Sequence, residues 1–176
     1  MNRPLSLCPW GTVLILFLAM AAYCQEGEYL LFEDCEDASP PALPAGWSAD
    51  DENNDGETWH GRDFGGEAGS PCVRLLTGPG GADDWLYLPG VSLSTGVNYT
   101  LGFHHRVTAE GIPHDLEVAL ATAPTSTAIT MPLLGPIQIM NRDAMATSHT
   151  FTVASSGTYH LVFHDIGFEA LFGHDS

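Results

Sequence analysis

The stretch Asn98–Val107, NYTLGFHHRV, decides the fold class of this chain. Tyr99, Leu101, Phe103, His105 and Val107 alternate with Asn98, Thr100, Gly102, His104 and Arg106, which is the period-two pattern of a half-buried strand. Shorter alternations follow at 115–120 and 158–164, and nineteen glycines and twelve prolines separate such segments. We therefore predict eight or nine strands, no helix, and an all-β antiparallel β-sandwich.

Composition and charge exclude several classes of partner. The 176 residues contain 22 acidic side chains against five arginines and no lysine, for a formal net charge of −17. Such a surface repels phosphate backbones and anionic headgroups, so nucleic-acid binding and adsorption to a membrane surface are disfavoured. With 44% hydrophobic residues the chain can build a core, and its length fits one domain.

The N-terminus reads as an export signal. Arg3 supplies the positive region and Gly11–Ala22 the short apolar region of a signal peptide over 1–24, with cleavage after Ala21 or after Cys24. A lipoprotein signal with Cys24 lipidated is the alternative interpretation, although Tyr23 is bulky for such a site. We predict a secreted or cell-surface domain over 25–176, with no segment long and apolar enough to span a membrane.

Export changes how the cysteines are interpreted. Cys35 and Cys72 remain in the mature chain, and two cysteines in an oxidising compartment most simply form one disulfide. A metal-thiolate or nucleophile role needs a partner spacing that is absent here. A Cys35–Cys72 disulfide is therefore predicted.

A calcium site is the main candidate for chemistry. Asp51, Asn53, Asp55 and Gly56 fit the D-x-[DN]-x-[DN]-G pattern, which places oxygen ligands at alternate positions around one hard cation. The twelfth position is Arg62 and no helices flank the loop, so this is no EF-hand. The alternative is a solvated acidic turn. Two further acidic groups could contribute if the fold brings them together, namely Glu33-Asp34 and Asp83-Asp84.

Other chemistries find less support. His160 and His164 share a strand face and could meet His104 in a transition-metal site if their strands are neighbours, but scattered surface histidines are the favoured interpretation. Motifs of hydrolases, zinc proteases and nucleotide-binding proteins are absent. Trp47, Trp59 and Trp85 could stack on sugar rings if exposed, although buried packing is the commoner fate of tryptophan.

The order of several short motifs resembles the cleaved-adhesin domain of bacterial haemagglutinin and gingipain-type surface proteins. The motifs are Phe32-Glu33-Asp34, Leu43-Pro44-Ala45-Gly46-Trp47, the loop Asp51–Gly56, Thr58-Trp59, Asp83-Asp84-Trp85-Leu86, Val91-Ser92-Leu93 and Asn98-Tyr99-Thr100-Leu101-Gly102-Phe103. The resemblance runs from about Tyr29 to Phe163. It implies a jelly-roll sandwich related to MAM domains, calcium ions holding loops at its edge, and binding of proteins or glycans without catalysis.

The resemblance also implies roles for single residues. Glu33 and either Asp83 or Asp84 are expected near calcium, and Cys35 stands where the family often has glycine. The family usually closes with a strand carrying an acidic pair, whereas this chain runs from Phe163 through His164-Asp165-Ile166 to Ser176 without one. Three explanations stay open: the gene is truncated, Asp165 substitutes for the pair, or the last strand is missing and one sheet edge is open.

Three functions remain at this point. The first is a secreted bacterial adhesin-like module, non-catalytic and stabilised by Ca²⁺, which binds an extracellular protein or glycan. The second is an accessory binding module of a secreted protease or glycoside hydrolase. The third, least favoured, is a small hydrolase. All three share one fold, so the fold alone does not distinguish them.

Overall fold

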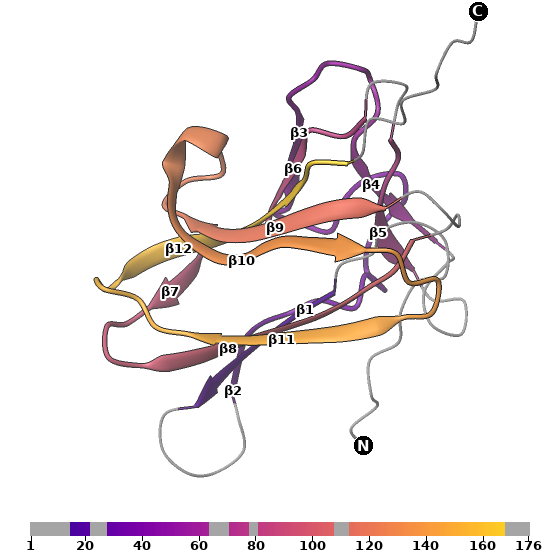
Figure 1. The fold of residues 1–176 in the computed structure, drawn as a ribbon. Coiled ribbons are helices and arrows are strands. Elements are labelled where there is room, and N and C mark those ends of the chain that lie inside the picture. The colour runs from indigo at the N-terminus through magenta and orange to yellow at the C-terminus, as the bar shows by residue number, and fades with distance from the viewer. Residues whose placement is uncertain (1–14, 22–27, 64–70, 78–80, 108–112, 168–176) are drawn as a thin grey trace, which may run out of the picture.

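The computed structural model describes residues 15–21, 28–63, 71–77, 81–107 and 113–167 (Figure 1). Almost all of its regular structure is strand. The elements are β1 (Ile15–Ala21), β2 (Glu28–Phe32), β3 (Ser48–Asp51), β4 (Trp59–Arg62), β5 (Cys72–Leu75), β6 (Asp84–Tyr87), β7 (Val91–Leu93), β8 (Asn98–His105), β9 (His114–Ala121), the short 3₁₀ turn η2 (Ser126–Ala128), β10 (Ile129–Ile139), β11 (Met145–Phe151) and β12 (Gly157–Asp165). None of the helical turns in these ranges is long and apolar enough to cross a membrane.

The strands form two stacked antiparallel sheets, which confirms the predicted β-sandwich. One sheet has the order β11-β8-β1-β2, and the other has the order β10-β9-β12-β6-β3 with β7 paired to β12. Figure 1 shows β8 and β11 running below β9 and β10 as separate layers. A small ladder of β4 and β5 completes the described part.

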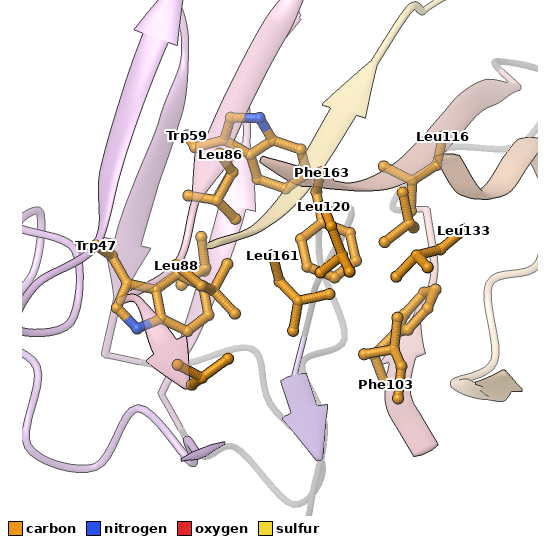
Figure 2. Packing of buried hydrophobic residues seen from close by; sticks show 14 of the residues in the cluster. Trp47, Trp59, Leu86, Leu88, Phe103, Leu116, Leu120, Leu133, Leu161 and Phe163 are labelled. Carbon is orange, nitrogen blue, oxygen red and sulfur yellow. The ribbon is translucent and has the colours of Figure 1, made fainter. Parts of the chain in front are cut away.

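Side chains from both sheets fill the space between the layers. Phe103 of β8 meets Phe163 of β12 edge to face, with ring centroids 5.3 Å apart. Figure 2 shows Phe163 with Leu120 and Leu161 near the centre of the cluster, Phe103 at the lower right and Trp47 at the left. The alternation predicted for Asn98–Val107 is thus confirmed, because Tyr99, Leu101 and Phe103 are all buried.

Alternation along β6 and β12 divides polar residues between the two faces of the larger sheet. Leu86 is paired with Phe163 and faces the core, so its neighbours Trp85 and Tyr87 face the opposite side. Asp84 is paired with Asp165, and both lie on the core side at the end of their strands. This division places the buried aspartates and the outward-facing aromatic residues on opposite faces of the sheet.

Two strands have bounds that the sequence pattern alone does not indicate. The segments 129–134 and 137–140 form a single strand, β10, which continues through Pro132 and Pro136 because it lies at the sheet edge. The polar run 50–58, whose composition favours a loop, begins within a strand, because Ser48–Asp51 is β3 and is paired with β6. The sequence pattern does not indicate β3, because two of its four residues are acidic and its inner face is only partly buried.

The apolar part of the predicted signal peptide lies in the smaller sheet. Ile15–Ala21 forms β1 and is paired with β8 on one side and with β2 on the other. Cleavage after Ala21 or Cys24 would therefore remove a strand and leave that side of β8 without its partner.

We predict that the exported protein begins at Ala22 or Gln25, because the apolar segment has the length and flanks of a cleaved signal. Intact-mass measurement of protein recovered outside the cell checks this. A mass that retains residues 15–21 would show instead that β1 is a permanent strand of the fold.

The predicted Cys35–Cys72 disulfide is not present in the structure. Cys35 is a buried free thiol, while Cys72 is engaged in a different disulfide. Neighbouring residues on a strand point to opposite faces, and on β5 it is Val73, with its backbone N–H next to the Cys35 sulfur, that meets Cys35. Cys35 has a φ of 61°, the left-handed conformation that favours glycine.

Cys35 should be unreactive in the folded protein. Burial, followed by the nearby charges of Glu33 and Asp34, raises the pKa of its thiol to about 12, so little thiolate is present at neutral pH. We predict that iodoacetamide at pH 8 labels Cys35 only after denaturation, as measured by peptide mass spectrometry. Rapid labelling of the native protein would contradict this burial.

Candidate functional site: a row of aspartates across the larger sheet

Three aspartates lie side by side across three adjacent strands. Asp51 of β3 is paired with Asp84 of β6, and Asp84 is paired in turn with Asp165 of β12. Directly paired residues in antiparallel strands present their side chains on the same face, with Cβ atoms roughly 5 Å apart. The fold therefore gathers carboxylates that are separated by up to 114 positions (165 − 51) in the sequence.

Asp84 is buried without a compensating partner. Its side chain is 1% exposed, and among the described residues neither carboxylate oxygen accepts a hydrogen bond of good geometry, although the buried Thr58 hydroxyl, itself without such a bond, lies next to it. Burial raises the pKa of Asp84 to about 7, the nearby Thr58 hydroxyl acts in the opposite direction, and the charges of Asp51, Asp55 and Asp165 raise it further. An ionised carboxylate is costly at such a position unless a cation or a set of donors compensates it.

Asp165 is only partly compensated. It is fully buried, and its Oδ2 is 2.8 Å from Nδ1 of His114, whereas its Oδ1 has no hydrogen-bond partner. Within the described residues, Asp84 and Asp165 thus present three buried oxygens without a hydrogen bond of good geometry, and the Thr58 hydroxyl is the neutral donor next to Asp84.

The predicted calcium loop lies at the same end of the sheet and is ordered by its own side chains. Asp51 accepts hydrogen bonds from the backbone N–H groups of Asp55, at 3.2 Å, and Gly56, at 2.9 Å. Asn53 donates to the carbonyl of Gly81 at 3.1 Å and joins this loop to the segment before Asp84. Gly56 has φ of 87°, which explains the glycine at the end of the motif.

The other two predicted ligands lie elsewhere. Glu33 follows β2 of the smaller sheet, accepts a 2.7 Å hydrogen bond from the Cys35 N–H, and has Asp34 and Asp37 as charged neighbours. Burial raises the pKa of Glu33. Asp83 points to the opposite face of the sheet from Asp84 and accepts a 2.7 Å hydrogen bond from His164. The structure therefore brings Asp51, Asn53, Asp55 and Asp84 together but leaves Glu33 and Asp83 outside this group.

No cluster of three His, Cys, Asp or Glu side chains among the described residues is already arranged to hold a metal ion. Calcium takes six to eight oxygen ligands, including amide and backbone carbonyl oxygens and water, so carboxylates supply only part of such a site. The unsatisfied oxygens of Asp84 and Asp165 are the feature of this region that fits a cation.

The histidines do not form the transition-metal site that was considered. His104 lies on β8 and His160 and His164 lie on β12, which belong to different sheets. His160 Nδ1 is 2.7 Å from the carbonyl of Leu88, and His164 contacts carboxylates. Burial lowers the pKa of His105 to about 4, so this residue is neutral and hydrogen-bonds Thr147.

Neither the place of Asp165 in the row nor its contact with His114 could be identified from the sequence alone. Asp165 was considered only as a substitute for a family motif, and nothing in the spacing connects it with Asp84. One sequence feature could have indicated Asp165. It is a charged residue at the end of β12, on the face where Leu161 and Phe163 are apolar.

The raised pKa of Asp84 predicts how stability depends on pH in the absence of a cation. The folded-state pKa of about 7 exceeds the ordinary value near 4, so the contribution of Asp84 is fully favourable below pH 4 and is lost as the pH rises through 7. In chelator, the melting temperature of Asp84→Asn should fall less between pH 5 and pH 8 than that of the unmodified chain. Identical slopes would contradict an ionisable buried Asp84.

No model of a known protein family matches the chain, and no curated protein matches it. Among solved structures the chain is similar to the K3 cleaved adhesin domain of Lys-gingipain from Porphyromonas gingivalis W83, with 19% identity and a TM-score of 0.49 over 71% of this chain and 84% of that one. It is also similar to the K1 cleaved adhesin domain of the same protein, with 17% identity and a TM-score of 0.45 over 71% and 90%. The C-terminal CBM6 of LamC, a marine laminarinase from Zobellia galactanivorans, has 17% identity and a TM-score of 0.45 over 68% and 82%.

These likenesses concern the arrangement of the strands, and at such identities and TM-scores they assign no residue, ligand or activity. In strand arrangement, the chain is similar to cleaved adhesin domains, as the short motifs predicted.

Proposed function

We propose that this chain is an exported, non-catalytic binding module that is stabilised by calcium and recognises an extracellular protein or glycan. The observation that carries the calcium part is the pair of buried aspartates, Asp84 and Asp165, with unsatisfied oxygens on the core face of the larger sheet. Export follows from the predicted signal peptide, and an extracellular medium supplies enough calcium to fill even a weak site.

Burial favours a structural role for these carboxylates over a catalytic one. A catalytic acid, base or nucleophile must reach its substrate within about 3 Å, directly or through one water. Asp84 and Asp165 are at most 1% exposed, so a substrate has no access to them in this conformation. A small cation held by these oxygens is compatible with the same burial.

Asp84 and Asp165 would hold the ion, with Asp51, Asn53 and Asp55 as the remaining candidates from the adjacent loop. Calcium would neutralise the repulsion between the carboxylates, and it would fix the loop Asp51–Gly56 to the ends of β6 and β12. The chain itself already positions this loop through the hydrogen bonds that Asp51 and Asn53 make.

The alternative is an accessory binding module of a secreted protease or glycoside hydrolase. It shares the fold, the export and the calcium site with the preferred function. A gene for such an enzyme beside this one would favour it.

Thermal unfolding with calcium and then with excess chelator tests the proposal. Calcium at about 100 times the dissociation constant of the site adds roughly 2.7 kcal/mol to the free energy of unfolding. For a domain of this size, that raises the melting temperature by roughly 5–10 °C. Asp84→Asn and Asp165→Asn should each abolish the shift. At pH 8 in chelator, Asp84→Asn should also be at least as stable as the unmodified chain, because it removes a buried charge that lacks a partner.

Glu36→Gln is the matched control, since it also removes one carboxylate but from an exposed position in a turn. It should keep the full calcium shift. If the unmodified protein shows no shift at millimolar calcium, or if all three variants lose it equally, the calcium site is wrong.

A further inference from the structure

The outer face of the larger sheet carries a pocket that the calcium site does not use. Because Asp84 and Asp165 face the core, the next residue on β6 and the previous one on β12, Trp85 and His164, face outward. There they border a second apolar cluster formed by Tyr87, Ala121 and Val162. Beside this cluster is a pocket of about 130 Å³.

Irregular pairing between β9 and β10 shapes this pocket. Their register shifts three times, between Ile129 and Met131, between Pro132 and Leu134, and between Leu134 and Ile137. Residues at these shifts line the pocket. Bulges of this kind re-aim side chains and are common next to functional sites.

Gly135 closes one side of the pocket by allowing β10 to pass close to β9. Its φ is 130°, and a Cβ atom at this position would lie 2.8 Å from the Cα of Glu117. Any larger residue would push β10 away from Glu117. The pocket is thus part of the backbone arrangement and is not a gap left by one mobile side chain.

The walls are apolar and the rim is acidic. The aliphatic lining residues include Ala119, Ile129, Pro132, Leu134 and Val162, and the ionisable ones are Glu117 and His164. His164 is held between two half-exposed carboxylates, with Nε2 at 2.7 Å from Asp83 and Nδ1 at 3.4 Å from Glu117. Two carboxylates therefore contact one imidazole, and none of the arginines in the described ranges lines the pocket.

This chemistry fits one class of ligand better than the others. An apolar wall with a carboxylate at its mouth matches a side chain that has an aliphatic stem and a cationic head. A sugar ring is disfavoured because His164 covers one face of the Trp85 ring, parallel to it at a centroid distance of 3.7 Å, and because few polar groups remain for its hydroxyls. An acidic ligand would be repelled by the rim and by a chain with net charge −17.

We propose that this pocket binds an arginine or lysine side chain of a protein partner, with the stem against Ala119, Ile129 and Val162 and the cationic group at Glu117. The proposal rests on the function proposed above, and it chooses a protein over a glycan as the partner for this face.

Nuclear magnetic resonance of the ¹⁵N-labelled chain, with calcium present, tests the pocket with defined probes. The probes are acetyl-Gly-Xaa-Gly-amide peptides in which Xaa is arginine, lysine, norleucine or glutamate, together with methyl β-glucopyranoside. The arginine or lysine peptide should give saturable shifts at Glu117, Ala119, Val162 and the Trp85 indole at concentrations on the order of 10 mM. The norleucine peptide should bind roughly threefold more weakly. It lacks the cationic group that would pair with Glu117, and an exposed ion pair typically contributes about that much to affinity.

Variants separate the two parts of the proposed site. Glu117→Gln should weaken binding of the arginine peptide roughly threefold without changing the affinity for the norleucine peptide. Ala119→Leu should abolish binding of both peptides by filling the pocket. Asp115→Asn is the matched control, because Asp115 lies two residues before Glu117 on the same strand face and does not line the pocket. It should leave both affinities unchanged.

Three results would overturn the pocket assignment. They are no saturable shift with either cationic peptide, an equal loss in Glu117→Gln and Asp115→Asn, or shifts at the pocket that are strongest with the glucoside. A failure here with an intact calcium-dependent melting shift removes this partner class and leaves the proposed function in place. Loss of the calcium shift would instead contradict the proposed function itself.

Discussion

The constraint on which this structure depends is the burial of Asp84 between two other aspartates. The pairing of β3, β6 and β12 places Asp51, Asp84 and Asp165 in one row, on the face that otherwise forms the hydrophobic core. A carboxylate there loses its hydration and gains like-charged neighbours, so its pKa rises to about 7. Either a proton or a cation must compensate it in the folded protein. With a pKa of about 7 the carboxyl is only about half protonated at neutral pH, and the proposed calcium ion would compensate the ionised form.

The same strand pair serves two faces with different chemistry. Along β6, Asp84 faces inward and Trp85 outward, and along β12, Asp165 faces inward and His164 outward. The inner pair belongs to the aspartate row, and the outer pair stacks with ring centroids 3.7 Å apart at the acidic rim of the pocket. On each strand, adjacent residues therefore belong to the two proposed sites, the calcium site on the inner face and the partner pocket on the outer face. This arrangement places a candidate recognition site on rigid strands and not on a mobile loop.

The fold class could be predicted from the sequence because alternation is a local signal. Tyr99, Leu101 and Phe103 show it over eight residues, and the structure buries all three. Ser48–Asp51 was missed because its short polar sequence has no apolar alternation to detect. The Cys35–Cys72 pairing was wrong because counting cysteines does not reveal which face of β5 meets Cys35.

The candidate site was predictable only in part. The spacing of Asp51, Asn53 and Asp55 is visible within one loop, whereas Asp165 joins them only through pairing across two strands. The pocket left no sequence signal, since it arises from register shifts between β9 and β10. Both sites are formed by the pairing and register of strands that are distant in the sequence. These depend on the complete sandwich and not on a local pattern.

Diffraction from crystals of the mature protein grown with calcium tests the central claim most directly, through the anomalous signal of the bound ion. The account predicts a peak at roughly 2.3–2.6 Å from carboxylate oxygens of both Asp84 and Asp165, with further oxygens from the loop Asp51–Gly56. A structure in which these two aspartates remain without an ion, or in which calcium is found only at Glu33 or Asp83, would contradict it.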